Sequence, residues 1–209
     1  MIVLGLGISR KETKKIHYFL NSQEKFIFDY ESDLEKISWY DSENIVVNRM
    51  EQLENRLYKN TKSENSFTTT GDVGFYFLPY IELLLNNFPY LKIISTKKSK
   101  KKTFVDVMSD IKTKNSLLSR IFMFKKKYKN HWIDHDGSNW EKDFQLDKCY
   151  PKFNVKNLDT SINSYIEMYI FELKKIQKKY PNNIKVFFSD ELDSEYGKKK
   201  VMSFLKSTS

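Results

Sequence analysis

The sequence predicts an α/β fold, a three-layer sandwich in which helices cover both faces of a mainly parallel central sheet. Short apolar runs typical of buried strands recur along the chain, and longer segments with helical periodicity separate them. Helical crossovers between such strands favour parallel pairing, which buries both faces of the sheet. The 209 residues are 40% hydrophobic, and no internal repeat or Gly/Ser-rich linker divides them. We therefore expect one domain that spans residues 1–209.

The first half of the chain alternates predicted strands and helices. Residues 2–6 form an apolar run that ends in a glycine turn, as expected for a buried strand. Ser9 is a suitable N-cap, and Glu12 completes a capping box for a helix over residues 11–20. The next predicted elements are a weak strand at 26–28, a helix over 48–58, a strand at 67–70 and a helix over 76–87 with Pro79 in its first turn.

The second half continues this alternation. The longest helical stripe runs through residues 161–180 and predicts a helix there. The other predicted elements are a strand at 91–96, helices over 102–112 and 115–129, an irregular segment at 130–153, a strand at 184–188 and a helix over 194–205.

The chain is basic, with a formal net charge of +9. A positive net charge favours an anionic partner, such as nucleic acid, a phosphorylated ligand or an acidic surface. Only four of the 36 basic residues are Arg, a skew that an AT-rich coding sequence produces whatever the function. Local clustering is therefore more informative than the bulk charge, and five Lys fall within residues 97–102.

Two basic segments follow predicted strands. Gly5, Gly7, Arg10 and Lys11 lie where the first strand passes into a helix, and backbone N–H groups at such a turn suit a phosphate or sulfate. Lys98 follows the strand at 91–96. Because parallel strands gather ligands at their carboxyl ends, Lys98 is placed to reach the same anion. The alternatives are a tight structural turn and a solvated lysine loop.

The irregular segment at 130–153 is a candidate binding loop, because it is rich in aromatic and polar residues. His131 and His135 could be taken for a metal pair, but no third ligand accompanies them, so we expect no metal site. The single cysteine, Cys149, excludes an internal disulfide, and we interpret it as a structural thiol.

Several of these segments together resemble the sulfotransferase family of the P-loop nucleotide-binding fold, specifically its short microbial and algal branch. The resembling segments span nearly the whole chain in the expected order: residues 71–80, residues 88–94 running into the basic segment, Asn130-His131-Trp132, residues 147–153, residues 181–187 and Phe204-Leu205. The resemblance implies transfer of a sulfuryl group from 3′-phosphoadenosine 5′-phosphosulfate (PAPS) to a hydroxyl or amine acceptor.

The resemblance also implies site residues. The first turn would surround the 5′-phosphosulfate with Gly7, Ile8, Ser9, Arg10, Lys11, Glu12 and Thr13. Lys98 matches an Arg that the family directs at the 3′-phosphate, and Asp106 stands where the family has a Ser. A carboxylate repels phosphate, so either Thr103 or Ser109 replaces that hydroxyl or the pocket is altered.

Catalysis of this transfer requires positioning, cations and a proton acceptor, but no metal. Lys11 is the candidate for the cation that assists the transfer. Asp72 is the first candidate base and His131 the second, while the alternative for Asp72 is a helix cap.

Two other functions remain possible at this point: a basic nucleic-acid-binding protein and a P-loop small-molecule kinase. No apolar run approaches the length of a membrane span, and charge follows residues 1–6 at once, so we expect a cytoplasmic protein.

Overall fold

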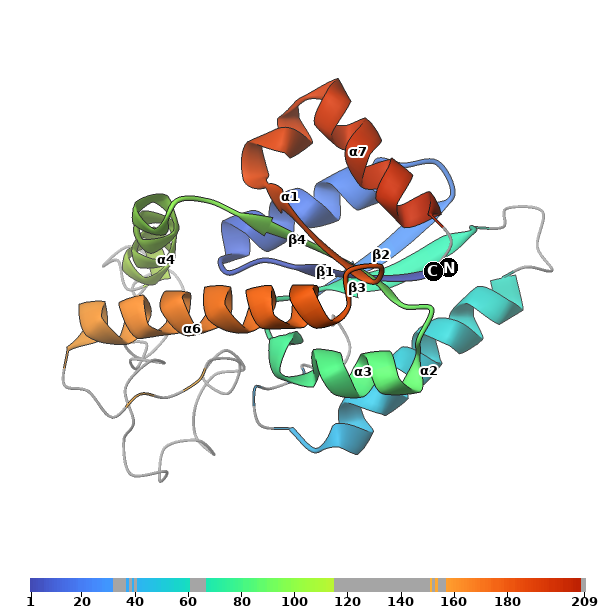
Figure 1. The fold of residues 1–209 in the computed structure, drawn as a ribbon, viewed down its shortest axis with the longest axis horizontal. Coiled ribbons are helices and arrows are strands. Elements are labelled where there is room, and N and C mark those ends of the chain that lie inside the picture. The colour runs from blue at the N-terminus through green and yellow to red at the C-terminus, as the bar shows by residue number, and fades with distance from the viewer. Residues whose placement is uncertain are drawn as a thin grey trace.

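The computed structural model describes residues 1–31, 37, 39, 41–60, 67–114, 151, 153 and 157–207. Five strands form one parallel sheet in the order β2-β3-β1-β4-β5, and helices cover both of its faces (Figure 1). The predicted α/β class with a parallel central sheet is confirmed. The strands are β1 (Ile2–Leu6), β2 (Phe26–Tyr30), β3 (Thr69–Val73), β4 (Lys92–Lys97) and β5 (Ile184–Phe188).

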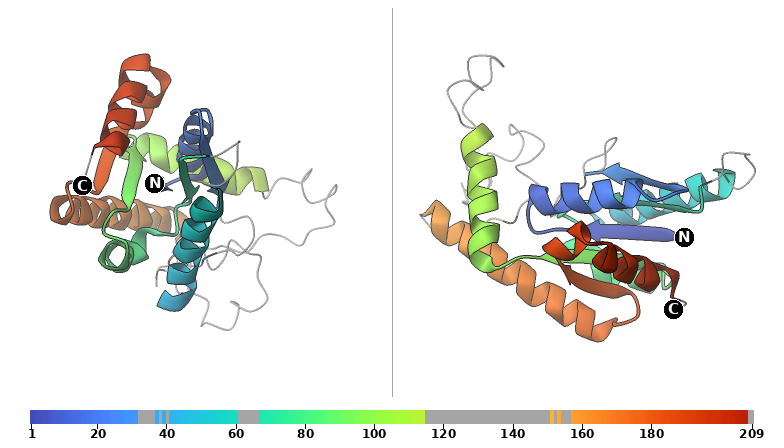
Figure 2. Two further views of the ribbon diagram at one scale, coloured as in Figure 1. Left: turned by 90° about the vertical axis from the view of Figure 1, so that its right-hand side faces the viewer. Right: turned by 90° about the horizontal axis from the view of Figure 1, so that it is seen from above.

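The helices form the outer layers. The α-helices are α1 (Arg10–Asn21), α2 (Glu43–Asn60), α3 (Ile81–Asn87), α4 (Lys100–Lys114), α6 (Leu158–Lys179) and α7 (Glu195–Lys206). Short 3-10 helices, η1 (Leu78–Tyr80) and η3 (Ser189–Asp193), precede α3 and α7. α1 and α7 lie on one face of the sheet, whereas α2, α3 and α6 lie on the other (Figures 1 and 2).

The alternation of side chains along β1 divides the core into two clusters. Leu4 and Leu6 pack with residues of α2, α3 and α6, whereas Val3 packs with α1 and α7. All five residues of β1 are buried. This continuous burial explains why the central strand reads as an uninterrupted apolar run rather than an alternating one.

Several predicted bounds differ from the observed ones, and two of these differences involve a glycine or a proline. The strand predicted at 67–70 is β3, which continues through Gly71 and Asp72 to Val73. A glycine is required inside this strand, because a Cβ on Gly71 would lie 1.7 Å from the carbonyl oxygen of Val3 in β1. The helix predicted over 76–87 divides into η1, with Pro79 in its first turn, and α3.

The order of the strands places the point where the connections diverge between β1 and β4. The chain leaving β1 crosses to β2 at one edge of the sheet, whereas the chain leaving β4 reaches β5 at the other. Ligands of open α/β sheets bind where connections diverge in this way, at the carboxyl ends of the strands. The turn before α1 and the start of α4 lie at that position.

Candidate functional site

The N-terminus of α1 follows directly from the carboxyl end of β1. Ser9 has the extended backbone of an N-cap, with φ −124° and ψ 159°. Its hydroxyl accepts the Glu12 N–H at 3.4 Å, and its own N–H donates to Glu12 Oε2 at 3.3 Å. The predicted capping box is therefore confirmed, and it fixes the direction in which the positive end of α1 points.

Gly7 and Ile8 form the tight connection between β1 and α1. A Cβ on Gly7 would lie 2.8 Å from the backbone N of Thr13 and 2.9 Å from Cβ of Glu12, so a larger residue would displace the start of the helix. The carbonyl of Ile8 accepts a hydrogen bond from the hydroxyl of Tyr165 at 3.1 Å. This buried bond ties the turn to α6 on the opposite face of the sheet.

Arg10 and Thr13 hold α1 against the end of β2. Arg10 pairs with Glu31 at 3.0 Å, and the Thr13 hydroxyl lies 3.1 Å from the hydroxyl of Tyr30. Thr13 has no exposed surface, whereas the side chain of Arg10 is partly exposed. Of the two, only Arg10 therefore borders solvent at the site.

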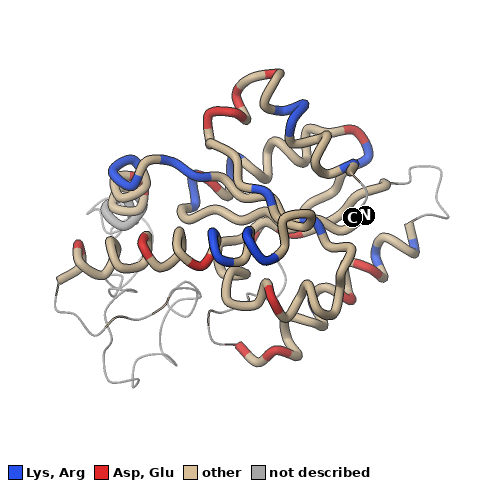
Figure 3. The backbone as a smooth tube through the Cα atoms, viewed as in Figure 1, with Lys and Arg blue, Asp and Glu red and all other residues tan. Residues whose placement is uncertain are grey.

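Lys11, Lys98 and Asp106 meet at the carboxyl end of the sheet. Asp106 of α4 accepts from Lys11 Nζ at 2.9 Å and from Lys98 Nζ at 2.7 Å. Burial alone would raise the pKa of Asp106, but the hydrogen bonds from Lys98 and Lys11 outweigh it and hold the pKa below its usual value. The structure thus joins two predicted cations that lie far apart in the sequence, and Figure 3 shows the basic run where β4 passes into α4.

Glu12 lies beneath these cations and has no exposed surface. Its Oε2 atom belongs to the capping box, while Oε1 has no hydrogen-bond partner within the described residues. Burial raises the pKa of Glu12 to about 7, although Lys98 and the Ser9 N–H act in the opposite direction. Glu12 is therefore a carboxyl group that titrates near neutral pH inside the candidate site.

Asp72 lies apart from this cluster, on the α2 side of β3. It is completely buried, and Arg49 donates to its Oδ2 atom from Nε at 3.1 Å and from Nη2 at 3.0 Å. Arg49 also pairs with Asp29 of β2. The capping role considered for Asp72 is wrong, because Asp72 lies within β3. Asp72 also has no exposed surface, so its carboxylate is not placed to meet a substrate in this structure.

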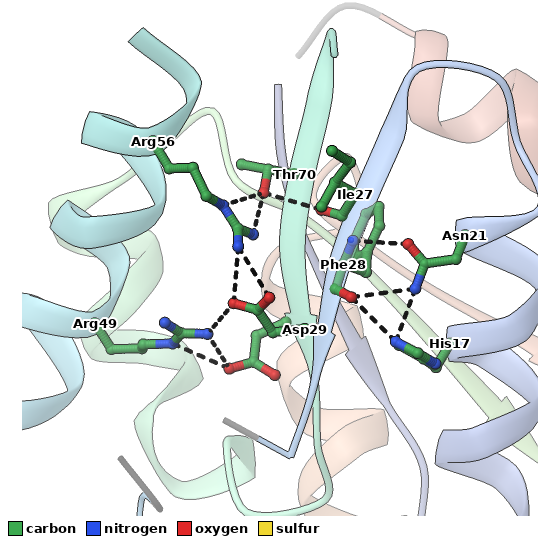
Figure 4. Close-up of polar contacts among 9 residues, drawn as sticks. His17, Asn21, Ile27, Phe28, Asp29, Arg49, Arg56 and Thr70 are labelled. Atoms are coloured by element: carbon green, nitrogen blue, oxygen red, sulfur yellow. Dashed lines mark hydrogen bonds and ion pairs between the residues drawn. The ribbon is translucent and has the colours of Figure 1, made fainter. Parts of the chain in front are cut away.

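Arg56 extends this network along α2. It donates from Nη1 to Asp29 at 2.9 Å and from Nε to the hydroxyl of Thr70 at 3.1 Å. Burial would raise the pKa of Asp29, but Arg56 and Arg49 outweigh it and lower that pKa. Figure 4 shows Arg49 and Arg56 pointing from α2 toward Asp29. We refer to Asp29, Arg49, Arg56, Thr70 and Asp72 as the α2 network.

The remaining predicted residues divide into buried and undescribed ones. Thr103 is fully buried and donates to the carbonyl of Ser99 at 3.2 Å, so its hydroxyl serves its own helix. His131, Cys149 and the helix predicted at 115–129 lie outside the described residues. Within the described ranges, no group of three or more His, Cys, Asp or Glu side chains is arranged to hold a metal ion. None of the described helices is long and apolar enough to span a membrane.

Sequence reasoning missed the partners that other elements bring to the site. Tyr165 and Tyr169 lie one turn apart on the buried face of α6, and the hydroxyl of Tyr169 has no partner among the described residues. Burial raises the pKa of Tyr169, and the charge of Glu12 adds to this. The sequence does carry one signal for these contacts, because two tyrosines interrupt the apolar stripe of this helix. A buried tyrosine hydroxyl normally has a hydrogen-bond partner, so such tyrosines indicate polar groups on a neighbouring element.

Comparison with models of known protein families gave no match to this chain. Comparison with curated proteins also gave none.

Proposed function

We propose that the protein is a PAPS-dependent sulfotransferase that transfers a sulfuryl group to a hydroxyl or amine acceptor. One observation carries the proposal. Lys11, in the first turn of α1, and Lys98, in the turn after β4, converge on one carboxylate beside the capped N-terminus of α1. Two cations and a helix N-terminus at the diverging connections of a parallel sheet suit a ligand with several anionic groups.

Two sets of residues would bind the two anionic ends of the donor, the 5′-phosphosulfate and the 3′-phosphate. The first turn of α1, with Lys11 and Arg10, suits the 5′-phosphosulfate, because the positive end of the helix dipole and two cationic side chains lie there. Lys98 would bind the 3′-phosphate. As the only ion-pair partner of Lys98 that the structure describes, Asp106 would release it to the phosphate when the donor binds.

In this reaction the acceptor oxygen or nitrogen attacks sulfur, and the bond between sulfur and the bridging phosphate oxygen breaks. 3′,5′-Adenosine bisphosphate leaves with the bonding electrons, and the acceptor proton passes to a base. Lys11 stabilises the negative charge that develops on the bridging oxygen. Of the two candidate bases, Asp72 is held by Arg49, so the role falls to His131.

Thermal-shift titration with 3′,5′-adenosine bisphosphate, ATP and single-stranded DNA tests this proposal. We expect the bisphosphate to raise Tm more than ATP does, and Lys98→Ala to reduce the shift that the bisphosphate causes. Lys100→Ala is the matched control, because Lys100 lies two residues away and pairs with Glu167 of α6. Preference for ATP would indicate a kinase, and stabilisation by DNA alone would indicate a nucleic-acid-binding protein; either result contradicts the proposal.

A further inference from the structure

Glu12 combines two features that the capping box does not require. A capping-box glutamate on an exposed helix keeps its carboxylate in water, whereas Glu12 has no exposed surface. One of its oxygens, Oε1, also has no hydrogen-bond partner among the described residues. An ionised carboxylate in such a position loses hydration without full compensation, so burial favours its neutral form.

The groups around Glu12 come from three elements. Lys98, after β4, favours the ionised form, and Asp106 of α4 opposes it. Tyr169 of α6 is completely buried and interacts electrostatically with Glu12. Arg10 and Lys11, which belong to the same helix, pair with Glu31 and Asp106. The cations that could hold Glu12 ionised are thus already shared with other acids.

An anion at the N-terminus of α1 changes this balance in one direction. It brings negative charge close to the Glu12 carboxylate, which accepts the N–H of the N-cap residue itself. A bisphosphate also engages Lys98 through its 3′-phosphate, and Lys98 is the main charge that favours ionised Glu12. Both effects favour the protonated carboxyl group.

We propose that Glu12 takes up a proton when an anion binds at the N-terminus of α1, so that binding weakens as the pH rises. This proposal rests on the proposed function in one respect: the anion is taken to be a phosphate group of the sulfuryl donor. Anion binding at the candidate site is then coupled to proton uptake, and Glu12 is the side chain that takes up the proton.

The direction and size of the effect follow from linkage. Because the pKa of unliganded Glu12 is about 7, the carboxyl group is about half ionised at pH 7 and mostly ionised at pH 8. Binding must then supply the proton from solvent. The dissociation constant should rise about fivefold between pH 7 and pH 8, and should approach about tenfold per pH unit above that.

Isothermal titration calorimetry at pH 7, 8 and 9 tests the inference, with inorganic sulfate and 3′,5′-adenosine bisphosphate as separate probes. Sulfate keeps its charge between pH 7 and pH 9, and the phosphates lose their second proton near pH 6. Titration of the probes themselves therefore does not account for a change in the dissociation constant over this range. Titrations in two buffers of different ionisation enthalpy count the protons taken up. Glu12→Gln is the matched variant, because glutamine can accept the Ser9 N–H and preserve the capping box.

We expect proton uptake and weakening with pH in the wild type, and a dissociation constant within about twofold across the range in Glu12→Gln. Equal pH dependence in both proteins, or none in the wild type, would overturn the inference and leave the proposed function standing. Proton-coupled binding of sulfate without binding of the bisphosphate would support the inference and overturn the proposed donor. If neither probe binds at any pH, both are overturned.

Discussion

Two polar clusters flank the central strands, and they use similar residues differently. In the α2 network, two arginines donate hydrogen bonds to Asp29, Asp72 and the hydroxyl of Thr70. At the candidate site, which we call the α1 site, two lysines share Asp106, and Glu12 keeps an unpartnered oxygen. Arginine holds a carboxylate in a fixed fork, whereas lysine is a mobile point charge. The first cluster is therefore suited to hold the sheet together, and the second to exchange its partners for a ligand.

Removal of Asp72 should give the largest effect and should act on stability. Asp72→Ala leaves Arg49 buried beside β3 without its main partner, and we expect a loss of about 3–5 kcal/mol in the free energy of unfolding, measured by urea denaturation. Asp193→Ala is the control. Asp193 pairs with Lys15 on the surface, and its removal should cost less than about 1 kcal/mol. A stable Asp72→Ala protein that has lost turnover would instead identify Asp72 as catalytic.

Lys98→Ala should give the largest effect on binding. We expect 3′,5′-adenosine bisphosphate to bind with a penalty of about 1.5–3 kcal/mol, roughly 10–150-fold in the dissociation constant. Calorimetric titration measures it, with Lys100→Ala as the unaffected control. An unchanged dissociation constant would remove Lys98 from the α1 site.

Glu12→Gln should stabilise the protein at pH 8 but not at pH 5. The pKa of Glu12 is raised in the folded state from 4.5 to about 7, so the folded protein binds this proton more tightly than the unfolded chain does. Stability therefore falls as the pH rises between these values. Glutamine avoids this loss, and we expect about 1–3 kcal/mol of additional stability at pH 8 from denaturation curves. A variant less stable than the wild type at pH 8 would show that ionised Glu12 is well solvated.

Asp106→Asn should give the smallest effect. The amide keeps the approximate size of the side chain, releases Lys11 and Lys98, and removes a negative charge from the anion site. We expect 3′,5′-adenosine bisphosphate to bind about three- to tenfold more tightly in calorimetric titration. Weaker binding would mean that Asp106 holds the lysines in the binding geometry rather than competing for them.

The sequence was most informative where the structure depends on local signals. The buried run of β1 and the Ser9–Glu12 capping box both follow from residues a few positions apart, and both were predicted correctly. The predicted strand at 67–70 stops short of the end of β3, because Gly and Asp are rare inside strands and residues 71 and 72 are of these types. Gly71 is instead needed for the close approach of β3 to β1, and Asp72 is kept inside the sheet by Arg49.

The candidate site was predictable only in part. Because the carboxyl ends of parallel strands meet at one edge of the sheet, the sequence predicts that Lys11 and Lys98 lie close together. The structure brings both to Asp106. The burial of Glu12 and its proximity to Tyr169 depend on how α6 packs across the sheet, and residue spacing carries no signal for this. For the same reason, the partners of Arg10 and Thr13 on β2 appear only in three dimensions.

The most direct test of the α1 site compares two ligands on the wild-type protein. 3′,5′-Adenosine bisphosphate and 5′-AMP differ only in the 3′-phosphate, which Lys98 is proposed to bind. At pH 7 we expect the bisphosphate to bind roughly 10–150-fold more tightly in calorimetric titration, and Lys98→Ala to remove that difference. Equal affinity of the wild type for the two ligands would contradict the assignment of a PAPS site to the ends of β1 and β4.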